Sequence, residues 1–143
     1  KDKGITVLDV NELAETNFNI DDKVDSFLRD LNGRENIIVD SRLAWYFIDK
    51  SFKVYLYADL DTAVNRVQGT NRDTEGNLDD KGELYESIKG RQDAEVKRFK
   101  RLYGVDLEDL TNYDLVVDTS LLTPEEVLEK IIRRYKEWER KNY

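Results

Sequence analysis

The sequence predicts an α/β fold in which helices cover both faces of a parallel sheet. Short segments that are apolar throughout, as in strands buried on both faces, alternate with longer segments in which apolar residues recur every three to four positions. This alternation favours parallel strands joined by helices. The 143 residues suffice for one domain with a substantial core. We therefore expect three layers, with the sheet between two layers of helices.

Two helices are expected in the first third of the chain. A short one covers residues 7–14 and a longer one covers residues 20–31. Gly33 follows the longer segment and is typical of a helix end. At helical spacing, five apolar side chains of that segment share one face, namely Ile20, Val24, Phe27, Leu28 and Leu31.

Three short apolar segments are the predicted strands, and they cover residues 36–40, 53–58 and 113–118. Between the first two, residues 41–49 are compact and aromatic, which favours a helical turn. We interpret the aromatic run Trp45–Phe47 as core packing rather than as a platform on which a base stacks.

Two more helices are predicted between the second and third strands. The first covers residues 59–68, and the second covers residues 83–103 and ends at Gly104. Residues 69–82 separate them, and their polar, glycine-containing sequence predicts a mobile loop.

The last helix has the clearest start signal in the chain. Pro124 stands at its first position after Thr123, and Glu126 completes the pattern of a capping box. The Lys and Glu residues of 125–141 are interpreted as an ordinary solvated face without a function of its own.

The composition restricts the chemistry that the chain can perform. It has no Cys and no His, which excludes a thiol nucleophile, a zinc–thiolate site and the commonest general base. Phosphoryl transfer remains possible, because it depends mainly on positioning and charge stabilisation. The net charge of -8 disfavours nonspecific binding to nucleic acid or anionic lipid. No apolar run is long enough to span a membrane and no signal peptide is visible, so the sequence predicts a cytoplasmic protein.

The most informative pattern lies within the predicted helix 83–103. Arg91, Glu95 and Arg98 stand at i, i+4 and i+7, so they form one stripe along the helix. Two guanidiniums with a carboxylate between them suit a phosphate that lies beside a polar base or sugar. The alternative from spacing alone is a surface ladder of Arg–Glu pairs, each worth about 0.2–0.5 kcal/mol.

Polar residues also come after two of the predicted strands. Asp40-Ser41-Arg42 comes after the first, and Asp118-Thr119-Ser120 comes after the third. Ligands of open parallel sheets bind beyond the carboxyl ends of the strands. The sheet and the arginine stripe therefore indicate the same cleft.

These residues carry a family resemblance. The segment that begins with the stripe, residues 91–127, resembles the corresponding part of cytidylate kinases, notably the short form common in archaea. Residues 37–44 resemble the family's strand that ends in an acidic residue, Gly and Arg. Residues 52–66 are similar to the strand and helix that carry an adenine-side arginine, and residues 4–25 resemble the helices that bind the monophosphate. The resemblance to this P-loop nucleoside monophosphate kinase family covers nearly the whole chain.

The resemblance implies roles on the acceptor side of the reaction. Arg42, Arg91 and Arg98 would bind the phosphate of the acceptor monophosphate, and Arg91 and Arg98 would also stabilise charge during transfer. Glu95 would help to orient the acceptor nucleotide and the arginines. The implied reaction is the ATP-dependent phosphorylation of CMP, dCMP or a related monophosphate.

On the donor side, the resemblance implies ATP and Mg²⁺ as cofactors. Arg66 would stack near the adenine of ATP, and Arg72, in the predicted loop, would act as a lid arginine. Asp40 would reach the Mg²⁺ ion through water.

Several of these residues also have simpler interpretations. Arg42 could be a surface ion-pair residue, and Arg66 could belong to a solvated helix face. Asp40 and Asp118 could cap the helices that come after them, which is the interpretation that we favour for Asp118.

The phosphate-binding loop of the resembled family is missing from this sequence. None of the seven glycines belongs to a G-x-x-x-x-G-K-[ST] motif. The strand before that loop would lie in the middle of the sheet, and its loss would leave unpaired backbone groups at about 1–3 kcal/mol each. We therefore expect a strand–loop–helix unit of roughly 30–40 residues ahead of Lys1. We also expect no turnover from the 143 residues alone.

The resemblance divides the chain as one incomplete kinase domain over residues 1–143. Residues 1–33 would form the monophosphate-binding helices, residues 34–68 and 104–143 the core, and residues 69–103 the lid loop and lid helix.

Two other hypotheses stay open beside the kinase. One is a non-catalytic nucleotide-binding or interaction protein of the same fold that lacks the phosphate loop. The other is a different monophosphate or small-molecule kinase, because Ser41 and Leu43 replace the Gly and Asp that flank the arginine in related sequences. In each case nucleotides are the expected partners, nucleic acid and membranes are not, and the oligomeric state is open.

Overall fold

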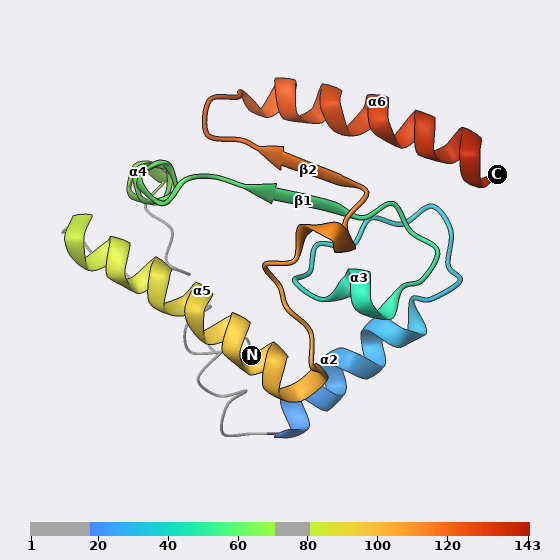
Figure 1. Ribbon diagram of the computed structural model, residues 1–143, viewed down its shortest axis with the longest axis horizontal. Coiled ribbons are helices and arrows are strands. Elements are labelled where there is room, and N and C mark those ends of the chain that lie inside the picture. Colours follow the sequence, from blue (N-terminus) through green and yellow to red (C-terminus); the bar gives the residue numbers. More distant parts are fainter. Residues whose placement is uncertain (1–17, 71–80) are drawn as a thin grey trace. The chain divides into compact units, whose positions relative to one another are not determined.

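The computed structural model describes residues 18–70 and 81–143 as a mixed α/β fold with a small parallel sheet (Figure 1). The described elements, in chain order, are α2 (Phe18–Asp30), α3 (Ala44–Phe47), β1 (Val54–Tyr57), α4 (Leu60–Thr70), α5 (Lys81–Tyr103), the 3₁₀ helix η2 (Leu110–Asn112), β2 (Leu115–Asp118) and α6 (Pro124–Asn142).

The chain divides into two compact units. The helical unit comprises Lys1–Ile20 and Ala58–Asp109, and it contains α4 and α5. The sheet unit comprises Asp21–Tyr57 and Leu110–Tyr143, and it contains both strands, α3, α6 and nearly all of α2. The predicted division into core, lid and monophosphate-binding parts stays a prediction.

An apolar core holds the helical unit together. Val64 of α4 and Leu84 and Ile88 of α5 are almost fully buried and form one cluster. The apolar residues at the edge of the cluster are Leu60, Val67 and Tyr85. The two helices therefore pack through one apolar face of each.

α5 ends where the sequence predicts. Gly104 adopts a φ of +69°, which a residue with a Cβ rarely adopts, and its N–H donates to the carbonyl oxygen of Lys100 at 2.9 Å. The helices on either side of the predicted loop 69–82 extend into it, because α4 ends at Thr70 and α5 begins at Lys81. The rest of that loop and the predicted helix 7–14 lie outside the described residues.

The sheet unit is built on one pair of parallel strands. β1 and β2 pair from Val54↔Leu115 to Tyr57↔Asp118, which confirms the predicted parallel arrangement of these two segments. Leu115 and Val117 are buried, whereas the alternate positions of β2 are exposed. One face of β2 is thus covered and the other is open, and the predicted three-layer arrangement stays a prediction.

The strand predicted at residues 36–40 is wrong. These residues form neither strand nor helix, and the side chain of Ile38 is 100% exposed. Asn36, at the start of the segment, has a φ of +58°, which interrupts an extended backbone. A strand also needs a hydrogen-bonded neighbour, and within the described residues β1 and β2 pair only with each other.

The buried side of α2 differs from the predicted apolar face. Leu28 is buried, but Val24 and Phe27 of the same predicted face are 49% and 63% exposed. Instead, the Arg29 guanidinium lies 4.9 Å from the centre of the Phe47 ring of α3. The side of α2 that is buried depends on residues distant in the sequence, and the periodicity of α2 cannot specify it.

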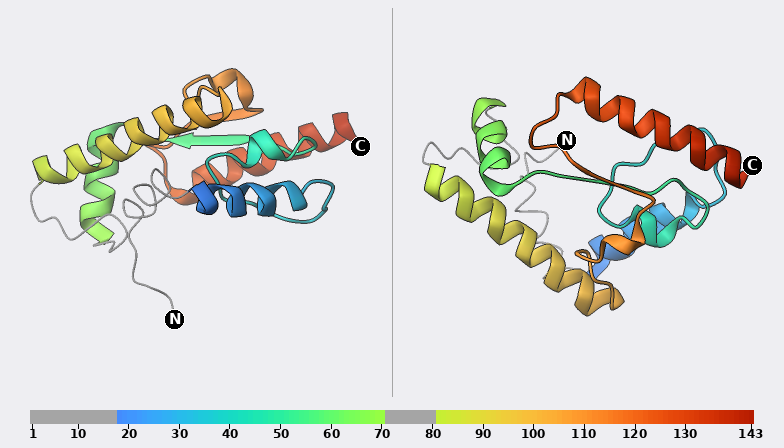
Figure 2. Two further views of the ribbon diagram at one scale, coloured as in Figure 1. Left: turned by 90° about the horizontal axis from the view of Figure 1, so that it is seen from below. Right: turned by 45° about the horizontal axis from the view of Figure 1, so that its top comes forward.

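α6 begins with the predicted capping box and lies beside β2 (Figures 1 and 2). Its aromatic residues pack against the residue two positions before β1, because the Phe52 ring centre is 5.8 Å from those of Tyr135 and Trp138. None of the described helices combines the length and apolar composition needed to cross a bilayer.

Candidate functional site

The predicted arginine stripe lies on the inward-facing side of α5. Leu84 and Ile88 are buried on this side, and Glu95 and Arg98, further along the same side, are each only 7% exposed. Arg91 is half-buried between these two pairs. An exposed ladder of ion pairs would instead lie on the solvated face of the helix. The stripe therefore continues the buried side that packs the helical unit.

Burial of the stripe strengthens the electrostatic interactions of its charged side chains. A partly dehydrated charge interacts more strongly with an opposite charge than an exposed one does. The Arg98 guanidinium also lies 4.6 Å from the centre of the Phe99 ring, whose side chain is buried. This contact restricts the direction in which the guanidinium points.

Of the two arginines predicted to contact ATP, the structure describes one. Arg66 lies on the exposed side of α4, whereas Val64 and Val67 of the same helix pack against α5. Arg72 lies outside the described residues. The predicted role of each of these two residues stays a prediction.

Asp40 and Arg42 belong to the sheet unit, and both are exposed. Because residues 36–40 do not form a strand, Asp40 is not presented at a strand end as predicted. Arg42 directly precedes the α3 region, and its carbonyl oxygen accepts a hydrogen bond of 3.0 Å from the indole nitrogen of Trp45. The sequence analysis did not predict this hydrogen bond, although the two residues are only three positions apart.

Asp118 does stand at the end of a strand, but it does not cap a helix as we favoured. Its carboxylate accepts hydrogen bonds from the backbone nitrogen of Ser120 at 2.9 Å and from the Ser120 hydroxyl at 2.6 Å. These contacts form a turn directly after β2. The side chain that caps α6 is Thr123.

The aromatic run Trp45–Phe47 is only partly core. Phe47 is buried, Trp45 is half-buried, and Tyr46 is 42% exposed. The Trp45 ring also contacts Tyr113, with 5.7 Å between ring centres, and Tyr113 in turn contacts Tyr55 of β1 at 4.9 Å. Burial raises the pKa of the Tyr113 hydroxyl, Tyr55 raises it further, and the charge of Arg42 opposes both.

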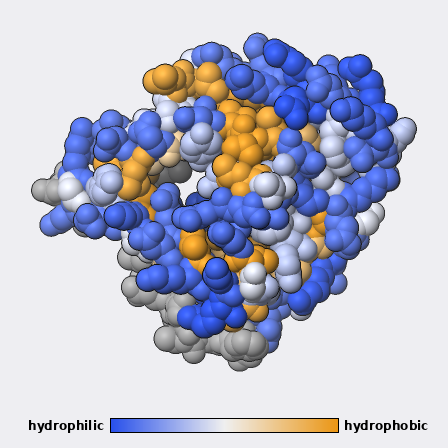
Figure 3. Space-filling model, viewed as in Figure 1, coloured by the Kyte–Doolittle hydropathy of each residue, from blue (hydrophilic) through white to orange (hydrophobic). Residues whose placement is uncertain are grey.

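A groove that the sequence did not predict lies between β2 and α6. Its volume is about 580 Å³, and apolar surface borders it (Figure 3). Its lining combines Val116 and Leu121 with three cationic side chains of α6, those of Lys130, Arg133 and Arg134. The Lys and Glu residues of 125–141 are all exposed, as predicted for a solvated face, and the absence of a function for them stays a prediction.

Comparison with known proteins decides the family. A sequence profile described as the cytidylate kinase-like family matches residues 5–121, which is most of the chain. The chain belongs to the cytidylate kinase-like family. This confirms the resemblance on which the predicted roles of the site residues rest.

Individual relatives of this cytidylate kinase-like chain support the assignment. The cytidylate kinase of Thermoplasma volcanium is 37% identical over 99% of this chain and 74% of its own length. The cytidylate kinase of Methanobrevibacter smithii is 32% identical over 95% of this chain and 76% of its own length. No solved structure gives a significant match.

A relative with a different name also matches the cytidylate kinase-like chain. The S-adenosylmethionine-dependent nucleotide dehydratase of Lacinutrix mariniflava is 33% identical over 92% of this chain, but the match covers only 27% of that protein. The similarity therefore concerns one part of a much longer protein.

Proposed function

We propose that the protein is a nucleoside monophosphate kinase that phosphorylates CMP, dCMP or a related monophosphate with ATP. Membership of the cytidylate kinase-like family supports a phosphotransferase. The observation that carries the acceptor site is the buried stripe of α5, in which Glu95 and Arg98 are each 7% exposed.

Arg91 and Arg98 would bind the acceptor phosphate and stabilise the charge that develops during transfer. A charge-assisted hydrogen bond is roughly twice as strong as a neutral one, and burial of the stripe limits competition from water. Glu95, between them, would orient the guanidiniums and the acceptor nucleotide. This mechanism needs alignment and positive charge, and it needs no general base.

The remaining predicted residues would serve the phosphates and the donor. Arg42 would add a third guanidinium to the acceptor phosphate, and Arg66 and Arg72 would contact ATP. Arg42 and Arg66 are exposed, so both side chains can be reached by a ligand.

Asp40 is the residue proposed to reach Mg²⁺, through water. Within the described residues, no group of three or more acidic side chains is placed to hold a metal ion. A single exposed carboxylate still fits Mg²⁺, because this ion keeps several waters and is often bound by one carboxylate together with substrate phosphates. When bound, Mg²⁺ would neutralise charge on the transferred phosphoryl group.

The donor phosphates need a loop that these 143 residues do not supply. No G-x-x-x-x-G-K-[ST] motif occurs in the sequence. In β1, Leu56 is 45% exposed, so apolar surface of the sheet is left for a further strand–loop–helix unit to cover. We therefore propose that the 143-residue chain binds the monophosphate but does not turn it over.

Calorimetric titration with CMP tests the acceptor site. Arg91→Ala and Arg98→Ala should each weaken binding by about 2 kcal/mol, or roughly thirtyfold, because each removes a charge-assisted contact. Arg101→Ala is the matched control, since Arg101 is an exposed arginine of the same helix. Unchanged affinity in both stripe variants would mean that the stripe is structural only.

A coupled ADP-release assay tests catalysis. The chain alone should give no turnover, and a chimera preceded by the corresponding N-terminal part of the Thermoplasma volcanium cytidylate kinase should phosphorylate CMP. Turnover by the chain alone contradicts the need for a further loop. CMP binding without turnover in the chimera would favour the non-catalytic nucleotide-binding alternative. A panel of other monophosphates in the same assay separates the kinase alternatives.

A further inference from the structure

Trp45 holds the main chain of Arg42 in place. The indole Nε1–H donates a 3.0 Å hydrogen bond to the Arg42 carbonyl oxygen. An indole nitrogen can only donate, so the direction of this bond is unambiguous. The region has little other regular structure, because α3 contains only four residues and its N-cap residue, Leu43, makes no side-chain cap.

Trp45 is itself supported by the sheet. Its ring contacts that of Tyr113, which lies just before β2, and the Tyr113 ring contacts Tyr55 within β1. The distances between ring centres are 5.7 Å and 4.9 Å, within the range of favourable aromatic pairs. A continuous series of ring contacts thus leads from the parallel strands to the backbone of Arg42.

The charge of Arg42 also influences this series. Its positive charge acts on the Tyr113 hydroxyl, whose pKa it lowers against the stronger effect of burial. The carbonyl group of Arg42 thus contacts Trp45 directly, and its charge acts on the hydroxyl of Tyr113.

We propose that Trp45 is a positioning residue for Arg42, and that Tyr113 supports it. The pair would fix the backbone of Arg42, so that its guanidinium meets the acceptor phosphate without first losing conformational freedom. The proposal rests on the phosphate-binding role proposed above for Arg42. It assigns a function to an aromatic residue that does not itself contact the nucleotide.

The central test compares phosphate-bearing and phosphate-free ligands. Trp45→Phe keeps an aromatic ring but removes the N–H donor, and it should weaken CMP binding by about tenfold while leaving the affinity for cytidine unchanged. A loss of general packing would weaken both ligands alike. Trp138→Phe is the matched control, because it changes the only other tryptophan, which packs on Phe52.

Fluorescence gives an independent readout from the same two variants. In Trp138→Phe, Trp45 is the sole tryptophan, and its emission should change on addition of CMP. In Trp45→Phe, the emission of Trp138 should not change on addition of CMP. The measurement on Trp138→Phe does not depend on the stability of the Trp45 variant, and circular dichroism of Trp45→Phe checks that this variant is folded.

Two further variants test the connections on either side of Trp45. Tyr113→Phe keeps the supporting ring and should bind CMP normally, whereas Tyr113→Leu should bind it more weakly. In an Arg42→Ala background, Trp45→Phe should cause no additional loss.

The possible failures are distinguishable. If the unaltered chain does not bind CMP, both the proposed function and the positioning role are wrong. If Arg42→Ala weakens CMP binding but Trp45→Phe does not, or if Trp45→Phe weakens CMP and cytidine equally, only the positioning role is wrong.

Discussion

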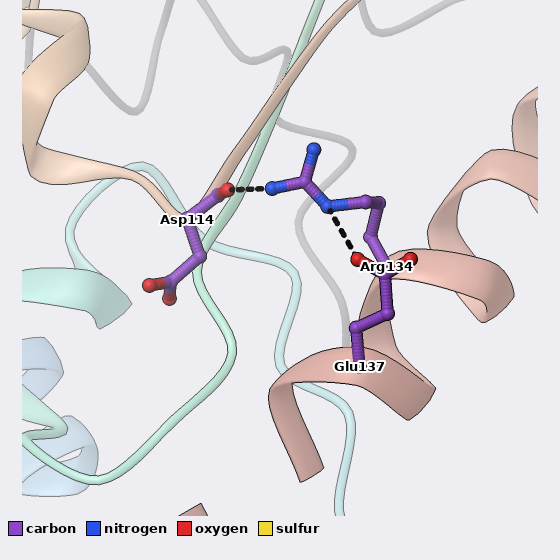
Figure 4. Close-up of polar contacts among 3 residues, drawn as sticks. All are labelled: Asp114, Arg134 and Glu137. Carbon is purple, nitrogen blue, oxygen red and sulfur yellow. Dashed lines mark hydrogen bonds and ion pairs between the residues drawn. The ribbon is translucent and has the colours of Figure 1, made fainter. Parts of the chain in front are cut away.

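Arg134 of α6 donates a hydrogen bond to the main-chain carbonyl oxygen of Asp114, with 3.2 Å between Nη2 and O (Figure 4). Asp114 is also joined to the residue before β1, because its carboxylate accepts from the backbone nitrogen of Lys53 at 2.8 Å. Asp114 therefore links α6, β2 and the start of β1. The second contact of Arg134 is an ion pair of 3.6 Å with Glu137 on its own helix.

Arg134→Ala should lower the free energy of unfolding by about 1–2 kcal/mol, because it removes a charge-assisted bond between elements. Glu137→Ala should cost at most about 0.5 kcal/mol, since an exposed ion pair at this spacing contributes little. Urea denaturation followed by tryptophan fluorescence measures both. Arg133→Ala, at the neighbouring exposed position, is the control, and equal effects at 133 and 134 would contradict the assigned bond.

The capping box of α6 makes a separate contribution to stability. The Thr123 hydroxyl accepts from the backbone nitrogen of Glu126 at 3.2 Å, and the Glu126 carboxylate accepts from the backbone nitrogen of Thr123 at 3.1 Å. Thr123→Ala should therefore lower the free energy of unfolding by about 1 kcal/mol. Thr123→Ser keeps the oxygen and should stay within about 0.5 kcal/mol of the parent in the same urea experiment. A similar loss in both variants would show that the hydroxyl is not responsible.

Gly90 and Gly104 should respond in opposite directions to the same substitution. Neither glycine has an atom within 4 Å of an added Cβ, so only the backbone conformation decides the outcome. Gly90→Ala, inside α5, should stabilise the fold by about 0.5–1 kcal/mol. Gly104→Ala, at a φ of +69°, should destabilise it by about 1–2 kcal/mol. Thermal unfolding monitored by circular dichroism compares them, and effects of the same sign would contradict this account.

The sequence was sufficient where the determining interaction is local. The start of α6 at Thr123 and the end of α5 at Gly104 depend on contacts within one helical turn, and both are as predicted. The alignment of Arg91, Glu95 and Arg98 along one side of α5 follows from helical spacing alone. The family was recognisable for the same reason, because its characteristic residues are close in sequence.

The remaining features depend on distant neighbours. The apolar segment 36–40 has the composition of a strand, but a strand forms only beside another one. Sequence spacing also could not reveal that the arginine stripe is buried. The contact of Trp45 with Tyr113 joins residues far apart in the chain, so no local pattern indicates it.

The Tyr113 hydroxyl should make the free energy of unfolding fall at alkaline pH. Burial raises the pKa of its hydroxyl above the ordinary value of 10.0, and Tyr55 adds to this effect. The folded protein thus holds this proton more tightly than the unfolded chain does. The resulting stabilisation is fully present below the unfolded pKa, and it is lost as the pH rises through the folded one. Urea denaturation from about pH 8 to about pH 11 should show a smaller alkaline loss in Tyr113→Phe than in the parent.

Arg42 opposes the raised pKa of Tyr113, so removing its charge should raise that pKa further. Arg42→Ala should therefore shift the titration of the Tyr113 hydroxyl, followed by NMR of isotope-labelled tyrosine, to higher pH. Arg133→Ala removes an equal charge elsewhere in the sheet unit and should leave the titration in place. An unchanged titration in Arg42→Ala would show that the charge of Arg42 does not act on the Tyr113 hydroxyl. That result would leave the hydrogen bond from Trp45 to the Arg42 carbonyl oxygen as the basis of the proposed positioning role.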